Sequence, residues 1–373
     1  MKYKFEDIIF NITEKKKPVE EDKYNYIGLE HLESGNLFIS KWGSDTAPEG
    51  EKIVMKKGDV LFGKRRAYQK KVAISPIDGI FSAHGMVLRP KEDVICKEFL
   101  PFFISSEAFL NEAIRISVGG LSPTVNWKDI RELEFDLPSL AEQKDLAEKL
   151  WAAYEVKQSY LKMIAATEEM VKSQFIEMFG CSAERVALSS LCDTFIDGDW
   201  IEAKDQSDSG IRLIQTGNVG VGTFKDKGDK ARYISEDTFN RLNCTEVVEG
   251  DILISRLPDP VGRACIVPAG LGKSITAVDC TIIKLNDKVL PKFFVAFTNT
   301  PDYAMQIKQV LSGTTRLRIS RANLGKIQSP LPTRDKQQQF VTIAEQADKS
   351  ISELHKSVDA IDKVIKSLIN ENL

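Results

Sequence analysis

The chain has 373 residues, which is enough for two or three domains that each bury a core of their own. Its 51 basic and 54 acidic residues give a net charge of −3, which excludes a uniformly basic nucleic-acid coat but permits local basic patches. Six scattered cysteines and three histidines do not make a typical zinc framework, and no stretch approaches the ~18 apolar residues of a membrane span, so we expect a cytoplasmic protein without a metal or a membrane segment.

The first half of the chain begins with short predicted strands. Residues 26–32 are typical of a strand and turn, and residues 56–66 place Gly-Asp before an apolar run that ends in cations. A further strand is predicted over 72–75, followed by a helix over 99–114 that begins through a proline. This half closes at Leu137-Pro138, after which the periodicity becomes that of a long helix.

The second half repeats the same order of elements. Leu331-Pro332 lies 194 positions after Leu137-Pro138 (331 − 137), about half of the 373 residues. Arg256 stands at the end of a predicted strand, where the first half has its cations. The chain is therefore predicted to be a duplication of one domain. The matched segments are 26–32 with 213–219, 56–66 with 248–258, 72–75 with 264–267, and 99–114 with 289–307.

A long helix is predicted after each Leu-Pro. In the second half the apolar positions alternate spacings of four and three, which is a coiled-coil seam, and at ~1.5 Å per residue such a helix is roughly 50 Å long. We expect the two helices to pair antiparallel and to hold two similar domains apart; ordinary helical packing inside one large domain is the alternative. The predicted seam residues are Leu146, Leu150, Ile164, Val171, Ala347, Ile351, Leu354, Val358, Ile361 and Ile365.

These patterns predict an α+β fold with internal pseudo-two-fold symmetry. Two similar mixed α/β domains are expected over residues 1–138 and 181–332. Two long antiparallel coiled-coil helices are expected to separate them, over residues 139–180 and 333–373.

Sequence motifs for enzyme chemistry are missing from the chain. GLGKS (270–274) lacks the upstream glycine of a phosphate loop, because Val267 stands there. Neither an amino-methylation motif nor the acidic-x-Lys element of a metal-dependent nuclease is found. His31, His84 and His355 are isolated, and such histidines are more often surface or core residues than catalysts. We therefore expect a chain that is not an enzyme by itself.

Two polar, basic loops are the candidate nucleic-acid contacts. GKRRAYQKK (63–71) combines phosphate-neutralising cations with a tyrosine ring, although a solvated charged hairpin is the alternative. TTRLRISRAN (314–323) sets three arginines among hydroxyls, Thr315 included, which suits forked contacts to guanine and phosphate. Its counterpart over 117–127 is far less basic, so the two halves should read different sequences. The candidate DNA-binding residues are Lys64, Arg65, Arg66, Tyr68, Lys70, Thr124, Asn126, Arg256, Arg316, Arg318, Arg321 and Asn323.

Two diverged domains, each followed by Leu-Pro and a long helix, closely resemble the specificity subunit of type I restriction-modification systems. The resemblance spans the whole chain and is carried by LPSLAEQ (137–143) with the helix to Gly180, and by LPTRDKQ (331–337) with the helix to Leu373. The second segment departs from the usual pattern, because it has Lys336-Gln337 where the first has Glu142-Gln143. This difference bears on the cap of the second helix.

The resemblance implies a non-catalytic DNA-recognition subunit. Its two target-recognition domains would each read one half of a bipartite, asymmetric site in double-stranded DNA, and its helices would set the separation and dock two methyltransferase subunits. Restriction subunits are a further candidate partner. No cofactor is expected on this chain, since S-adenosylmethionine, ATP and magnesium would be bound by the partners. The alternatives are a coiled-coil adaptor whose duplicated domains bind protein or glycan, and a stand-alone DNA-modifying enzyme.

Overall fold

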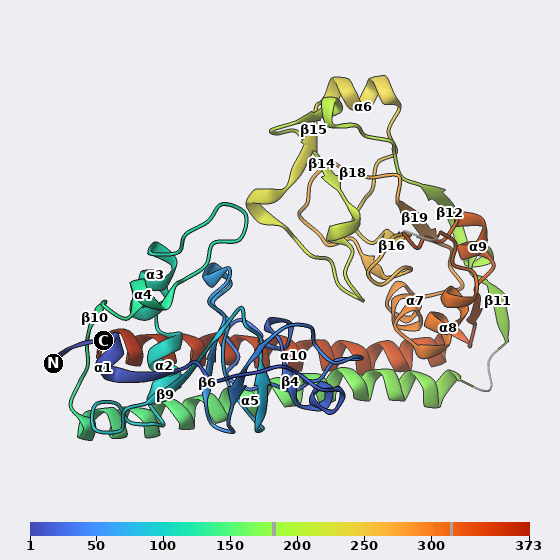
Figure 1. Ribbon diagram of the computed structural model, residues 1–373. Helices are drawn as coiled ribbons and strands as arrows, with labels where there is room; N and C mark the ends of the chain where they lie inside the picture. Colours follow the sequence, from blue (N-terminus) through green and yellow to red (C-terminus); the bar gives the residue numbers. More distant parts are fainter. Residues whose placement is uncertain (181–183, 314–315) are drawn as a thin grey trace. The chain divides into compact units, whose positions relative to one another are not determined.

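The protein is described here by a computed structural model that covers residues 1–180, 184–313 and 316–373. Two compact units are present. Unit 1 comprises Met1–Lys162 with Leu354–Leu373, and unit 2 comprises Met163–Glu353. Each unit is a mixed α/β structure that contains parts of two long helices (Figure 1).

Unit 1 contains three small sheets. Its strands are β1 (Lys2–Lys4), β2 (Ile9–Ile12), β3 (Lys15–Lys16), β4 (Tyr26–Ile27), β5 (Lys52–Met55), β6 (Val60–Phe62), β7 (Val72–Ile74), β8 (Gly79–Phe81), β9 (Met86–Pro90) and β10 (Glu134–Asp136). The sheet orders are β1-β10, β2-β9-β6-β7 and β3-β5-β8-β4. Strands β4 and β8 run parallel, and the other pairs run antiparallel. Its short helices are α1 (Phe5–Ile8), α2 (Leu100–Ser105), α3 (Glu107–Arg115) and α4 (Trp127–Ile130), and its 3₁₀ turns are η1 (Glu20–Asn25), η2 (Leu29–His31) and η3 (Ala67–Gln69).

Unit 2 repeats this plan. Its strands are β11 (Arg185–Ala187), β12 (Cys192–Asp197), β13 (Gln206–Ser207), β14 (Ile211–Ile214), β15 (Arg232–Ile234), β16 (Ile252–Ser255), β17 (Ala264–Ile266), β18 (Ser274–Thr276), β19 (Cys280–Leu285) and β20 (Gln328–Pro330). The sheet orders are β11-β20, β12-β19-β16-β17 and β13-β15-β14-β18. Its short helices are α6 (Glu236–Leu242), α7 (Pro291–Thr298), α8 (Pro301–Gln309) and α9 (Arg321–Gly325), and its 3₁₀ turns are η4 (Leu188–Leu191), η5 (Ala203–Asp205), η6 (Thr216–Asn218) and η7 (Gly228–Lys230). The first two sheets match those of unit 1 strand for strand, which confirms the predicted duplication.

A Gly-Asp turn starts the equivalent central strands β6 and β16. Gly58 and Gly250 have φ values of 91° and 86°, a region that favours glycine. The carboxylate of Asp59 accepts the backbone N–H of Lys56 at 2.7 Å, and that of Asp251 accepts the backbone N–H of Val248 at 3.0 Å. In each turn the glycine thus adopts the positive φ, and the aspartate accepts the hydrogen bond that closes the turn.

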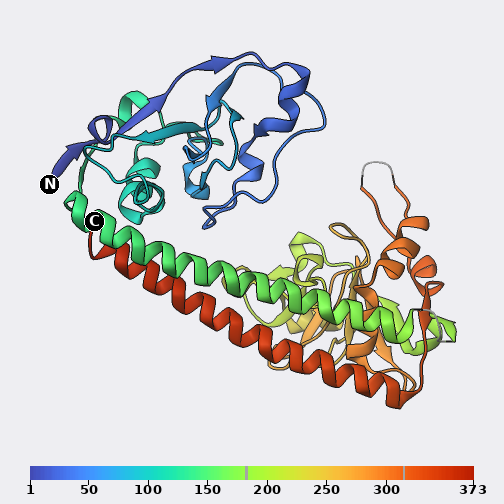
Figure 2. The ribbon, with the colours of Figure 1, turned by 90° about the horizontal axis from the view of Figure 1, so that it is seen from below.

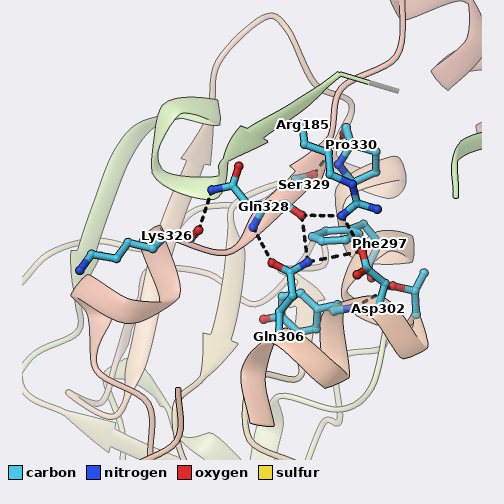
Figure 3. A network of polar contacts seen from close by, with 10 residues as sticks. Arg185, Phe297, Asp302, Gln306, Lys326, Gln328, Ser329 and Pro330 are labelled. Atoms are coloured by element: carbon cyan, nitrogen blue, oxygen red, sulfur yellow. Dashed lines mark hydrogen bonds and ion pairs between the residues drawn. The ribbon is translucent and has the colours of Figure 1, made fainter. Parts of the chain in front are cut away.

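The first strand of each unit pairs with the strand that immediately precedes Leu-Pro. In unit 1 this is β1 with β10, and in unit 2 it is β11 with β20. Figure 3 shows how unit 2 secures this pair: Arg185 donates to the Asp302 carboxylate at 2.7 Å, and the Gln306 side chain exchanges two hydrogen bonds with the backbone of Gln328. Each domain is therefore closed by its own ends before the long helix begins.

A buried glutamine attaches each long helix to its domain. The Gln143 side chain accepts the N–H of Cys96 at 2.8 Å and donates to the carbonyls of Val94 and Pro138. Gln337 makes the same three bonds, accepting the N–H of Leu290 and donating to the carbonyls of Lys288 and Pro332. In both repeated Leu-Pro segments, the glutamine is therefore the residue that attaches the long helix to its domain.

The residue before each glutamine differs in its role. Glu142 accepts both the N–H and the hydroxyl of Ser139, while its own N–H donates to the Ser139 hydroxyl at 3.4 Å, which forms a capping box. These hydrogen bonds lower the pKa of Glu142. Lys336 offers no carboxylate, so the second helix starts without that box.

The long helices are α5 (Leu140–Phe179) and α10 (Arg334–Asn370), which pair antiparallel (Figure 2). In unit 1, Leu150 and Tyr154 of α5 pack in one cluster with Ile369 of α10, and Lys157 pairs with Asp362 at 2.6 Å. In unit 2, Phe175 of α5 packs against Phe340 of α10, with ring centroids 5.1 Å apart. Of the predicted seam residues, Leu146, Leu150, Ile164, Ala347 and Val358 are buried, and Val171, Ile351, Leu354, Ile361 and Ile365 are partly buried.

Two helices were predicted too long. The helix expected over 99–114 is divided into α2 and α3, and the helix expected over 289–307 is divided into α7 and α8. The break is caused by new N-caps, because the Ser106 hydroxyl accepts the N–H of Phe109 and the Thr300 hydroxyl accepts the N–H of Tyr303. Both caps have sequence signals that the prediction missed, Ser-Ser-Glu at 105–107 and Thr-Pro-Asp at 300–302.

Candidate nucleic-acid interface

Two loops lie side by side in each unit and have the same hydrogen-bonded frame. The first loop spans residues 64–70 in unit 1 and 256–262 in unit 2, and it is closed by Gly63 N–H to Lys71 O and by Ser255 N–H to Arg263 O, both at 2.9 Å. The second loop spans 118–124 and 312–318, and a β-bridge between its end residues closes it in both units. The two loops touch through Val125 N–H to Lys64 O, and through Ile319 N–H to Arg256 O.

The first loop of unit 1 presents a group of cations. Arg65, Arg66 and Tyr68 are exposed at its surface and Lys64 is half-buried. Arg66 donates to the hydroxyl of Ser122 at 3.2 Å, which ties the first loop to the second. The predicted phosphate-binding cations and the aromatic ring are thus exposed on one loop.

Further basic residues reach this surface from other strands. Burial, and then the charge of Lys15, lower the pKa of Lys64. Burial, followed by the charges of Arg65, Lys64 and Lys52, lowers the pKa of His84, whose ring lies 3.3 Å from the Arg65 guanidinium. Mutual repulsion among cations is relieved when an anion binds between them, as a phosphate would. His84 was predicted to be isolated, because its neighbours come from β5 and the first loop, which are distant in the sequence.

Three predicted residues of unit 1 are directed toward the protein. Lys70 is partly buried and lines a cavity of about 310 Å³, where its charge lies close to Glu107. The Thr124 hydroxyl donates to the carbonyl of Ser122 at 3.2 Å, and Asn126 donates to the Asp129 carboxylate at 3.2 Å. Thr124 and Asn126 therefore support the second loop.

In unit 2 the exposed cations lie on and just after the second loop. Arg316, Arg318 and Arg321 are exposed, and Asn323 is partly buried, with its side chain donating to the Val310 carbonyl at 3.4 Å. Thr315, which belongs to the same predicted set, lies outside the described residues. Three arginines with exposed guanidinium groups remain the candidates for forked contacts in this unit.

Arg256 was predicted to contact DNA, and the structure corrects this. Its side chain is only 5% exposed and donates to the carbonyl of Val278 at 2.7 Å, and its Nε lies 3.4 Å from the Asp197 carboxylate. A cation at the end of a strand was assumed to face solvent, whereas this one bridges two loop segments from beneath. Arg256 is a structural residue of the interface.

Within the described residues, no group of three or more His, Cys, Asp or Glu side chains is placed to hold a metal ion. No helix among the residues that the structure covers is long and apolar enough to cross a membrane. Burial raises the pKa of the Cys265 thiol to about 12 and that of the Cys280 thiol to about 11, which makes both poor nucleophiles.

Known proteins with similar sequences and folds share this architecture over the full chain. The curated MjaVIII specificity subunit of a type I restriction enzyme from Methanocaldococcus jannaschii is 22% identical, over 98% of this chain and 89% of that protein. A solved chain from work on complex assembly and conformational transition of the type I R-M system has a TM-score of 0.56 at 18% identity, covering 100% of this chain and 97% of that chain. The S subunit of a type I restriction-modification system from M. genitalium has a TM-score of 0.51 at 13% identity, with 99% and 94% covered.

The match to a family model covers most of the chain. The model of the type I restriction modification DNA specificity domain matches residues 2–159 and again residues 183–362, one match for each half of the duplication. The chain therefore belongs to the family of type I restriction-modification specificity subunits.

Proposed function

We propose that this chain reads a bipartite, asymmetric site in double-stranded DNA, with one half-site bound by each unit. The proposal rests on one observation: the loops of the two units have the same backbone hydrogen bonds but different side chains. The two pairs of loops share length and backbone hydrogen bonds, yet the first loop of unit 1 exposes Arg65, Arg66 and Tyr68 where that of unit 2 exposes Pro258, Asp259 and Pro260. Equivalent loops with different chemistry suit two different half-sites.

In this proposal residues 1–138 and 181–332 are the target-recognition domains, and residues 139–180 and 333–373 are the spacer helices. The observed helix starts at Leu140 and Arg334 support this division. Binding by two tethered readers also raises affinity, because the second half-site is met at a high effective concentration.

The long helices are proposed to dock two methyltransferase subunits, with restriction subunits as a further partner. Exposed apolar side chains recur every seven residues along α5, at Val156, Met163 and Met170. Such a stripe on a helix is a typical surface for a partner helix. We propose that Met163→Glu combined with Met170→Glu abolishes co-purification with the methyltransferase subunit, while the nearby exposed Ala165→Glu leaves it intact; assembly of the double variant would refute this docking surface.

Methylation and cleavage are proposed to be carried out by those partners. The chain itself would bind no cofactor, and S-adenosylmethionine, ATP and magnesium would be held by the partner subunits. An assay of the purified chain alone for base methylation and strand cleavage tests this directly, and activity without partners would overturn it.

Half-site selectivity is the sharpest test of the two-reader proposal. Arg65→Ala is expected to weaken binding to duplexes that retain the half-site of unit 1, and Arg318→Ala to duplexes that retain the half-site of unit 2. Each lost phosphate contact should also lower the slope of log K against log salt by about 1. The controls are Lys97→Ala and Lys288→Ala, two exposed cations close to the buried glutamines. Equal loss at both half-sites for either arginine variant would contradict the proposal.

A further inference from the structure

The first loops of the two units have equal length and different chemistry. Each contains seven residues, and the last of them, Lys70 or Gly262, has a positive φ of 50° or 85°. The loop of unit 1 is cationic, whereas the exposed tip of the loop in unit 2 is Pro258-Asp259-Pro260. The loop of unit 2 occupies the position of the basic loop of unit 1 but has a carboxylate at its tip. A carboxylate does not bind phosphate, so this loop must have another role.

Arg263 holds this loop from within. Its side chain is 8% exposed and donates to four backbone carbonyls: Leu257 and Pro260 of the loop at 2.7 and 2.8 Å, and Thr216 and Val219 at 2.7 and 2.6 Å. Burial lowers the pKa of this guanidinium, and the nearby charge of Asp259 acts in the opposite direction. The carbonyls on both sides of Asp259 are thus fixed to one buried cation.

Two more contacts restrain the ends of the loop. The Tyr303 hydroxyl donates to the carbonyl of Gly262, the last residue, at 2.9 Å, and the guanidinium of Arg256, the first residue, donates to the carbonyl of Val278. In unit 1 the residue equivalent to Arg263 is Lys71, which makes one bond to the carbonyl of Leu29 at 2.6 Å. The loop of unit 2 is thus held from within by a buried guanidinium, whereas the loop of unit 1 is tied to its neighbours by the backbone N–H groups of Arg65 and Arg66 and by the Arg66 side chain. A fixed loop suits a group that reads a base.

The Asp259 side chain is exposed and has no hydrogen-bond or ion-pair partner among the residues that the structure describes. A carboxylate on a DNA-binding surface is repelled by phosphates and can only accept hydrogen bonds. In the major groove the exocyclic amino groups of cytosine (N4) and adenine (N6) are the donors that a carboxylate can pair with. Exposed arginines of the adjacent second loop, Arg316 and Arg318, are available to neutralise the flanking phosphates.

We propose that the carboxylate of Asp259, positioned by Arg263, accepts a hydrogen bond from the exocyclic amino group of one base, cytosine or adenine, in the half-site bound by unit 2. Asp259 is the specificity-determining residue in this assignment, and Arg263 is a positioning residue. The assignment rests on the proposed function, because it requires that unit 2 reads DNA.

The test is a selection of bound duplexes from a library with random base pairs, using the full-length chain with the methyltransferase subunits of its host. For the wild type we expect about tenfold or more discrimination at the position that Asp259 reads. Asp259→Ala should reduce this to about twofold or less, leave the half-site of unit 1 unchanged, and leave non-specific affinity equal or higher. Asp259→Asn should shift the preference toward adenine, since an amide pairs with adenine N6 and N7. The control is Asp287→Ala, another exposed aspartate of unit 2.

Arg263→Lys separates positioning from a general loss of structure. It keeps the charge but not the four-carbonyl fork, and we expect it to lower discrimination at the same base pair. In the double variant it should add about nothing to the loss that Asp259→Ala causes by itself. Additive effects at different positions would overturn the positioning role. An unchanged motif in Asp259→Ala would overturn the assignment while leaving the proposed function standing. A wild-type complex that selects no two-part motif would overturn the proposed function and the assignment with it.

Discussion

Replacing Gln337 by alanine tests the attachment of the second long helix to unit 2. The Gln337 side chain is fully buried and makes three hydrogen bonds, at 2.9 Å from Leu290 N–H, 2.9 Å to Lys288 O and 3.0 Å to Pro332 O. Each is worth roughly 1 kcal/mol, and a buried group left unpaired costs at least that much, so the loss should be about 3 kcal/mol. The free energy of local opening at the Leu290 amide, measured by native-state hydrogen exchange, should fall by that amount.

The adjacent Gln338 supplies a matched control. Its side chain is exposed on the same turn of α10, and Gln338→Ala should change the opening free energy by no more than about 0.5 kcal/mol. Gln143→Ala should have the effect of Gln337→Ala at the Cys96 amide in unit 1. If protection at Leu290 is the same in Gln337→Ala as in Gln338→Ala, the glutamine is not what secures the helix.

Three other changes probe the packing and the charge of the molecule. Leu150→Ala removes a fully buried side chain of α5 and should lower the free energy of unfolding of unit 1 by about 2–5 kcal/mol, as measured with urea. The control Val156→Ala, at an exposed position of the same helix, should lower it by less than about 1 kcal/mol. Equal losses for the two variants would contradict the assignment of Leu150 to the core. The lowered pKa of His84 means that free unit 1 favours the neutral ring, so its stability should fall as pH drops below about 6.5. Phosphates would raise that pKa again, so DNA affinity should increase as pH falls from 6.5 toward the lowered pKa, and His84→Gln should remove this dependence; an unchanged pH profile would exclude His84 from the interface. Arg316→Ala should reduce affinity only for duplexes that carry the half-site of unit 2, as judged by electrophoretic retardation at two salt concentrations, and a reduction at the other half-site would count against its assignment.

The duplication and the long helices could be predicted from the sequence because they depend on periodicity. Repeated Gly-Asp and Leu-Pro pairs fix turns whose geometry is local, and a heptad seam specifies a helix without knowledge of its partner. The breaks at Ser106 and Thr300 were missed although both are N-cap residues, and Pro301 stands at the start of α8 as a further signal. Local sequence signals were sufficient to predict the turns and the long helices, because interactions within the segment determine those structures.

The site was predicted less completely, because its surface is assembled from distant strands. Arg65 and Arg66 were found as a run in the sequence, but His84 joins them only through the pairing of other strands. Arg256 illustrates the opposite error, since a basic residue in the sequence gives no sign that it will be buried against a backbone carbonyl. The partners of Arg256, the Val278 carbonyl and the Asp197 carboxylate, lie far from it in the sequence, so no local spacing reveals them.

The central claim is that one chain reads two different half-sites through two equivalent pairs of loops. Its most direct test is methylome sequencing of the host with and without this chain. The account predicts that a methylated motif disappears with the chain, and that this motif consists of two unlike specific segments separated by unspecified bases. A lost motif that is a single continuous or palindromic sequence, or a methylome that does not change, would contradict it.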